Sequence, residues 1–133
     1  MADAPIRLHQ IVYVSRSLIG ERGATVREIA RVALPRNAAA GITGALFYDG
    51  ERFAQVLEGP WAETSLLMEA IRYDSRHFDV RVLRDAPLRA RRFADWSLRL
   101  VDRAQAPGVE ALLARERPGP ALALELADRL AQV

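Results

Sequence analysis

The apolar positions along the chain alternate in some stretches and recur every three or four residues in others, which predicts a mixed α and β protein. Alternation indicates strands over Leu8–Ser15, Ala45–Tyr48, Phe53–Leu57, Phe78–Leu83 and Trp96–Val101. Helical spacing lies over Val26–Ala40, Trp61–Tyr73, Val109–Arg117 and Ala121–Ala131. Pro87 interrupts the strand pattern between the last two strands, and Pro118–Pro120 separates the last two helices.

The first helix has recognisable signals at both ends. Thr25–Glu28 is a capping-box pattern, so we expect the helix to begin near Val26. Pro35 has no N–H and is expected to kink or end the helix, although Asn37–Ala40 can add another turn. Gly41 suits the left-handed residue that stops a helix. The inward side of this helix is expected to carry Ile29, Val32 and Ala33.

The order of elements is that of an α+β, ferredoxin-like βαββαββ sheet with two helices on one face. The first strand is apolar on both faces, so both sides of the sheet need cover. The C-terminal helices are expected to cover the second face, which carries Val12, Val14, Ala54 and Val56.

Gln55 is the anomalous residue in the central hairpin. Asp49-Gly50 favours a tight turn between two apolar runs. On the second run Phe53, Gln55 and Leu57 share one face, so the amide is expected to be buried and to need hydrogen-bond partners. A glutamine bonded to neighbouring backbone is the ordinary interpretation, and a functional amide is the alternative.

Other polar positions also have ordinary explanations when taken singly. Tyr13 is expected to be a buried phenol that needs a partner, on the same face as Ser15. Asn37 fits a helix-end hydrogen bond, and Asp74–His77 fits a solvated helix end.

Composition removes several classes of function. The 133 residues contain no cysteine and two histidines, which excludes disulfides and a closed zinc site and leaves no expected metal centre. The basic residues are arginines spread along the chain, with a formal net charge of +2, so we expect no nucleic-acid partner. No apolar run approaches a membrane span and no secretory pattern is present, so we expect a cytoplasmic protein without a membrane partner.

Taken together, these residues resemble the BLUF family of flavin-binding blue-light sensors over Arg7–Val101. The matching positions are Tyr13, Ser15, Ile29, Asn37, the GITG of Gly41–Gly44, the FAQVLEG around Gln55, Ile71, Asp74–His77 and Trp96.

The resemblance implies a non-covalently bound FAD whose ring lies between the two helices, with Ile29 and Ile71 on either side. It places Asn37 at the polar edge of the flavin, and Arg76 and His77 at its carbonyl side or the adjoining chain. Ser15 and Asp74 belong to the same cofactor-binding set. Gln55 lies between Tyr13 and the flavin N5/O4 edge, and Trp96 joins these two in the photoactive set.

The implied mechanism is a light-driven electron and proton transfer from Tyr13, followed by recombination. Gln55 is left with rewired hydrogen bonds, by rotation or by tautomerisation, and the flavin spectrum shifts to the red and recovers in the dark. Leu98 departs from the family, which usually carries methionine there. Leucine keeps the volume but removes the sulfur, so we expect signal transmission to be affected more than flavin binding.

We expect residues 1–103 to form the flavin-binding domain and residues 104–133 a helical extension that packs on the sheet. The tail after Ala104 is too short for a cyclase or phosphodiesterase, so the chain is expected to be a non-enzymatic, homo-oligomeric receptor that signals to a partner protein. The alternatives are a BLUF-like interaction module without photochemistry and, less favoured, a small hydrolase of the acyl-phosphatase kind. The latter lacks a phosphate-cradling loop and an evident acid-base pair.

Overall fold

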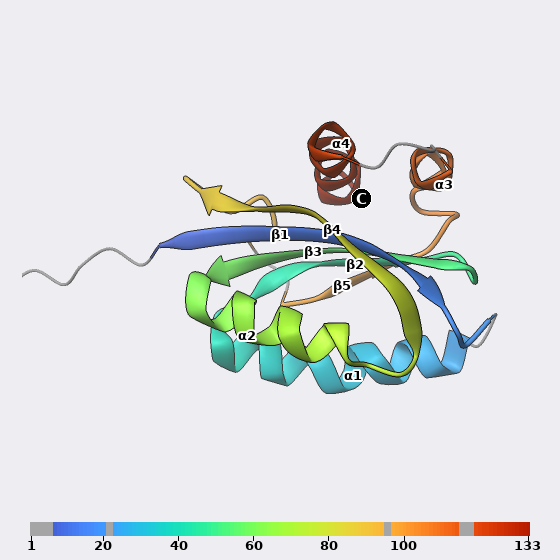
Figure 1. The fold of residues 1–133 in the computed structure, drawn as a ribbon, viewed down its shortest axis with the longest axis horizontal. Coiled ribbons are helices and arrows are strands. Elements are labelled where there is room, and N and C mark those ends of the chain that lie inside the picture. The colour runs from blue at the N-terminus through green and yellow to red at the C-terminus, as the bar shows by residue number, and fades with distance from the viewer. Residues whose placement is uncertain (1–6, 21–22, 95–96, 115–118) are drawn as a thin grey trace, which may run out of the picture.

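The computed structural model describes residues 7–20, 23–94, 97–114 and 119–133, and every structural statement below refers to these (Figure 1). The strands are β1 (Leu8–Ser17), β2 (Thr43–Tyr48), β3 (Arg52–Pro60), β4 (His77–Leu88) and β5 (Arg99–Val101). The helices are α1 (Gly23–Ala40), α2 (Trp61–Arg72), α3 (Pro107–Leu113) and α4 (Pro120–Ala131).

The strands form one sheet in the order β4-β1-β3-β2-β5. β1 lies antiparallel to both β3 and β4, β2 and β3 form the hairpin, and β5 joins the edge parallel to β2. Helices α1 and α2 lie on one face of the sheet, called the front face below, and α3 and α4 lie over the back face (Figure 1). The expected ferredoxin-like βαββαββ fold with C-terminal helices on the opposite face is therefore confirmed.

The back face of the sheet is an apolar surface covered mainly by α4. Val12, Ala54 and Val56 are fully buried there. They share one cluster with α4 residues spaced four apart, namely Leu122, Leu126 and Leu130. Each fully buried leucine contributes about 1.5–3 kcal/mol relative to exposure. The C-terminal helices are thus part of the hydrophobic core.

The front face is divided between its two helices. Leu46 and Phe53 pack with the buried residues of α1. Ile11, Tyr13 and Leu57 pack with Leu67 and Met68 of α2. The expected alternation along β1 is confirmed, since Ile11 and Tyr13 face the front and Val12 faces the back.

The predicted start of α1 is wrong. The helix begins at Gly23, so Thr25–Glu28 lies inside it. The Glu28 carboxylate instead accepts two hydrogen bonds from Arg31, at 2.9 and 2.5 Å. Pro35 does not end the helix either, because it lies on the exposed side, where water can bind the carbonyl that loses its donor.

The predicted end of α1 at Gly41 is confirmed. Gly41 has a φ of +70°, and the Ile42 N–H donates to the Asn37 carbonyl at 2.8 Å, which is the Schellman pattern. Of the predicted inward residues Ala33 is buried, whereas Val32 is 52% exposed and faces the cavity described below. The buried stripe runs instead through Val26, Ala30, Ala33 and Asn37.

All five strands differ in length from their predictions, and the differences at β4 and β5 are instructive. β4 continues through Pro87, because it is an edge strand and a residue without an N–H is tolerated there. β5 covers Arg99–Val101 only; its expected start, Trp96, lies outside the described residues. The predicted hairpin turn is confirmed, with a φ of +95° at Gly50 and the Asp49 carboxylate accepting the backbone N–H groups of Glu51 and Arg52.

The C-terminal helices begin slightly earlier than predicted. α3 starts at Pro107, a residue suited to a first helical turn, and ends at Leu113, earlier than predicted; Arg117, its expected end, lies outside the described residues. Over the part of the chain that the structure describes, none of the helices combines the length and apolarity needed to span a bilayer.

Candidate functional site

A cavity of about 290 Å³ lies between α1, α2 and the front face of the sheet. Its apolar lining comes from both helices, the sheet and the residue before β5: Ile29, Val32, Ala33, Leu67, Ala70, Ile71, Leu46, Phe53 and Leu98. Its polar lining consists of Tyr13, Glu28, Arg36, Gln55, Asp74, Arg76 and His77. A mostly apolar cavity with a few convergent polar groups is typical of a small-molecule site.

Ile29 and Ile71 lie on different helices that both line the cavity. Branched aliphatic side chains contributed from two sides form an apolar slot. Such a slot suits a planar aromatic ring, whose faces need apolar contact and whose edge needs hydrogen bonds.

Tyr13 and Gln55 form a buried hydrogen-bonded pair at the cavity wall. They are directly opposite each other on β1 and β3, and they are 3% and 7% exposed. The Tyr13 phenol donates to Gln55 Oε1 in a short contact. Burial raises the pKa of the Tyr13 phenol, and the negative charge of Asp74 raises it further, so the phenol stays protonated and acts as the donor. None of the described residues accepts a hydrogen bond from the Gln55 NH₂ group, and Gln55 lines the cavity.

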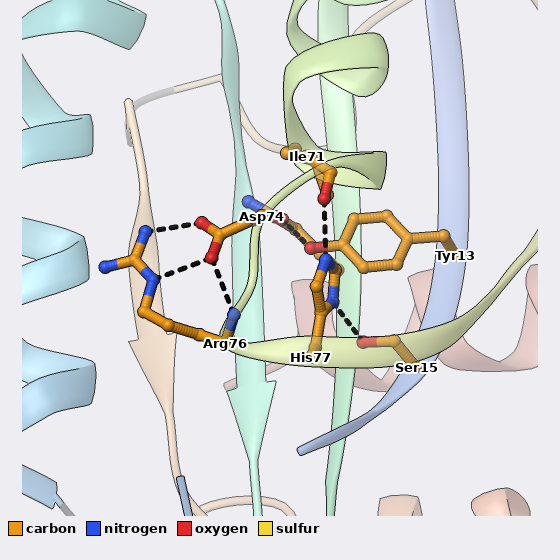
Figure 2. Close-up of polar contacts among 7 residues, drawn as sticks. Tyr13, Ser15, Ile71, Asp74, Arg76 and His77 are labelled. Atoms are coloured by element: carbon orange, nitrogen blue, oxygen red, sulfur yellow. Dashed lines mark hydrogen bonds and ion pairs between the residues drawn. The ribbon is translucent and has the colours of Figure 1, made fainter. Parts of the chain in front are cut away.

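His77 is held by two hydrogen bonds within the protein (Figure 2). Its Nε2 lies 2.6 Å from the Ile71 carbonyl oxygen, which can only accept, so Nε2 carries a proton. In the neutral ring Nδ1 then accepts from the Ser15 hydroxyl at 2.7 Å. The imidazole also meets the Tyr13 ring edge to face, with centroids 6.1 Å apart. His77 therefore contributes its ring face to the cavity, because both nitrogens are already bonded.

Asp74 and Arg76 form a bidentate ion pair at the cavity rim (Figure 2). Arg76 Nε and Nη2 donate to the two carboxylate oxygens at 2.8 and 2.5 Å, and the Arg76 backbone N–H adds a third bond at 2.9 Å. The Arg76 guanidinium holds the pKa of the Asp74 carboxyl below its usual range. Among the described residues nothing bonds to Arg76 Nη1, so this nitrogen is available to a ligand.

Asn37 has an unpaired acceptor in the core. Its side chain is 1% exposed, and its Nδ2 donates to the Ser97 carbonyl at 3.0 Å. No described residue donates to its Oδ1, which is buried. Buried acceptors are almost always hydrogen-bonded, so this atom calls for an N–H or O–H from a bound molecule.

The structure brings seven of the ten predicted site residues to the cavity wall: Tyr13, Ile29, Gln55, Ile71, Asp74, Arg76 and His77. Ser15 acts one step behind the wall, through His77, and Asn37 is not among the lining residues but binds the Ser97 carbonyl. Trp96 lies outside the described residues.

Sequence reasoning missed Arg36 and Phe53. The strand period places Phe53 on the face of Gln55, but that alone does not indicate that the face lines a cavity. Arg36 is two helical turns beyond Ile29, so the helix period could have indicated it.

Comparison with known proteins points to one family. A sequence model of BLUF, described as sensors of blue-light using FAD, matches residues 8–99. Photoactivated adenylate cyclase subunit beta of Euglena gracilis is 34% identical over 94 residues, which are 69% of this chain and 11% of that protein. The blue light- and temperature-regulated antirepressor BluF of Escherichia coli (strain K12) is 32% identical over 95 residues, which are 71% of this chain and 24% of that protein.

Among solved structures, the dark state of BlrB, a BLUF protein, superposes with a TM-score of 0.83 and 36% identity. That match covers 95% of this chain and 96% of the BlrB chain. The chain thus spans a quarter or less of the two curated relatives and nearly all of this shorter structural relative.

Proposed function

The chain belongs to the BLUF family of blue-light sensors that use FAD, and on that premise we propose that its switch is the hydrogen bond between Tyr13 and Gln55. The observation that carries the proposal is this buried phenol–amide pair at the wall of a cavity between two helices. The amide has no other partner among the described residues. It is therefore free to exchange one set of hydrogen bonds for another.

The residues present fit the polar edge of FAD. An isoalloxazine ring carries an imide N–H next to carbonyl oxygens. The buried Asn37 Oδ1 needs such a donor, and the unused N–H groups of Gln55 need such acceptors. Ile29 and Ile71 are proposed to contact the two faces of the ring, and Arg76 Nη1 to bind a carbonyl or the adjoining chain.

FAD, when bound, supplies the absorption of blue light and a strong oxidant in its excited state. Tyr13 is suited to respond because its phenol is protonated, oxidisable and already hydrogen-bonded to an amide. Its proton has a defined path along that bond to Gln55. The hydrogen bonds of His77 to Ser15 and to the Ile71 carbonyl fix the imidazole against the edge of the Tyr13 ring.

Gln55 is the residue whose hydrogen bonds are proposed to differ between the dark and the illuminated protein. Its amide has a donor group and an acceptor on one short arm, so rotation or tautomerisation reverses its hydrogen bonds without moving β3. In the dark its carbonyl accepts from Tyr13. After the change Tyr13 faces a donor, and the bonds toward the cavity are altered as well.

We propose that the chain is a sensor and not an enzyme, and that its output passes to a partner protein. The relatives are named as a photoactivated cyclase subunit and a light-regulated antirepressor. Residues 1–103 are proposed as the flavin-binding unit, and residues 104–133 as an extension that serves output or self-association in the cytoplasm.

The test is a light-minus-dark visible spectrum of FAD-loaded protein. We expect a reversible red shift in the wild type and in Gln132→Leu, which changes an exposed glutamine far from the cavity lining. Gln55→Leu should bind flavin and show no shift, because no amide remains to be rewired. A full reversible shift in Gln55→Leu rejects the switch. Bound flavin without a shift in the wild type supports an interaction module that has lost photochemistry.

A further inference from the structure

Three polar residues lie in register across the end of the otherwise apolar back face. Glu58 on β3 is directly opposite Gln10 on β1 and opposite Thr43 on β2. Gln10 and Glu58 are 1% and 0% exposed. The next row inward is apolar, with Val12, Val56 and Ala45 in register. A carboxylate at such a buried position requires specific partners.

All the partners of the Glu58 carboxylate are donors. Its Oε2 accepts from Gln10 Nε2 at 2.8 Å. Its Oε1 accepts from the backbone N–H groups of Arg92 and Phe93, at 2.7 and 3.1 Å. Gln10 Oε1 in turn accepts from Arg84 Nε at 2.9 Å. The carboxylate therefore joins β1, β3 and β4 to the segment that follows β4.

That segment has a long distance to cover. β4 and β5 are at opposite edges of the sheet, so the chain that joins them leaves one edge and arrives at the other. Arg91 supports the crossing with bonds to Thr43 Oγ1, the Glu58 carbonyl and the Gly41 carbonyl, at 2.9, 3.1 and 2.7 Å. The Phe93 side chain enters the back-face core at 1% exposure. Glu58 thus holds the connection at its middle.

The far end of the same connection reaches the cavity. The Ser97 carbonyl accepts from Asn37 Nδ2 at 3.0 Å, and Leu98 lines the cavity. Both residues lie within five positions of Phe93, so the point at which the connection is held limits where they can lie.

We propose that Glu58 is a positioning residue of the flavin site: it binds the 91–93 segment to the sheet end and so determines where Ser97 and Leu98 meet the cavity. This inference rests on the proposed function for its optical test. It also makes a claim about the flavin-free protein that can be tested separately.

Glu58→Gln changes the hydrogen bonding in a defined way. The new amide oxygen still accepts from Arg92 and Phe93, but its NH₂ group faces the Gln10 NH₂ group. If Gln10 rotates to avoid this, its NH₂ group faces Arg84 Nε instead. One buried donor is therefore unpaired in either arrangement. One unpaired buried donor shifts the equilibrium between the bound and the released connection about tenfold toward the released form.

The double exchange Gln10→Glu with Glu58→Gln repairs the network. The carboxylate on β1 accepts from Arg84 and from the new amide on β3, and the amide oxygen still accepts from the two backbone N–H groups. Leu126→Val is the control, because it removes a methylene from the same back-face core without changing a polar group.

In the flavin-free full chain we expect Glu58→Gln to speed amide hydrogen exchange at Arg92 and Phe93 by about tenfold and to shift the Leu98 methyl resonance. The double exchange should restore both signals, and Leu126→Val should leave them at wild-type values. In the FAD-loaded chain the same pattern should appear in the dark flavin band and in the dark-recovery rate. If Glu58→Gln does not fold, Glu58→Asp, which withdraws the carboxylate by one methylene, should show the same changes.

Leu98 and flavin signals that stay at wild-type values in a folded Glu58 variant would overturn the inference, whatever its thermal stability. Equal changes in Leu126→Val, or no recovery in the double exchange, would also overturn it. A wild-type chain that binds no FAD contradicts the proposed function, while the amide and methyl signals still decide the role of Glu58.

Discussion

Removing one member of the Tyr13–Gln55 pair leaves the other as a buried polar group without its hydrogen-bond partner. Removing both members leaves no such group. Tyr13→Phe leaves Gln55 Oε1 without its donor, and Gln55→Leu leaves the Tyr13 hydroxyl without its acceptor. Both side chains are almost fully buried, so water cannot easily replace the missing partner. Each single variant is expected to lose stability, and the double variant is expected to lose less than the sum.

The magnitude follows from the cost of an unpaired buried group, about 1–3 kcal/mol. In the double variant the two apolar groups contact each other and this penalty largely disappears, so we expect a coupling of about 1–2 kcal/mol. For a domain of this size, 1 kcal/mol corresponds to about 4 °C in melting temperature. Each single variant should therefore melt roughly 4–12 °C below the wild type.

The assay is urea unfolding of the four proteins of the cycle, with saturating FAD and without flavin. Both conditions are needed because a ligand that binds only the folded state adds its own stabilisation. Tyr73→Phe combined with Gln132→Leu provides a matched control cycle at exposed positions, where Tyr73 is 86% exposed. Additivity of the Tyr13 and Gln55 effects within about 0.5 kcal/mol, in both conditions, would refute the account of the pair.

Leu98→Met should keep the red shift and change the dark-recovery rate, because methionine adds a flexible thioether at a cavity-lining position; identical recovery and amide infrared difference spectra would assign the position to packing alone. Truncation after Arg103 removes α3 and α4 and should cause aggregation in light-scattering measurements, because the apolar back face is exposed; a stable, unaggregated truncated protein with an unchanged oligomeric state and photocycle would contradict this. Asp74→Asn should cost at most about 1 kcal/mol at neutral pH, since the ion pair with Arg76 is partly exposed. The pKa of Asp74 is lowered on folding, so its contribution is present above the unfolded value near 4 and is lost as the pH falls through the folded value; a stability difference between variant and wild type that persists unchanged at low pH would contradict the ion pair.

Local patterns predicted most of the fold. The alternation along β1 and β3 indicated which residues face each side, and the leucines of α4 indicated a helix that needs an apolar partner. What local patterns could not provide is position within the sheet. The sequence predicts an interruption at Pro87 because nothing near it in sequence shows that β4 is an edge strand.

The candidate site was predictable as a set of residue types but not as a set of contacts. The family resemblance implies that Gln55 adjoins Tyr13, but the residues alone do not, because the contact depends on the register between β1 and β3. Glu58 illustrates the same limit more strongly. Its partners are contributed by β1 and by backbone N–H groups more than thirty residues later, so no period in the sequence reveals that a buried carboxylate binds there.

The most direct test of the central claim is the infrared light-minus-dark difference spectrum of FAD-loaded protein labelled with ¹³C at the glutamine side-chain carbonyl. We expect a band pair that moves on labelling, since Gln55 exchanges its hydrogen bond with Tyr13 for another arrangement. Gln55→Leu should lack this band pair, and Gln132→Leu should keep it. A wild-type protein that shows the red shift of the flavin but no isotope-sensitive glutamine band would contradict the claim that Gln55 is the switch.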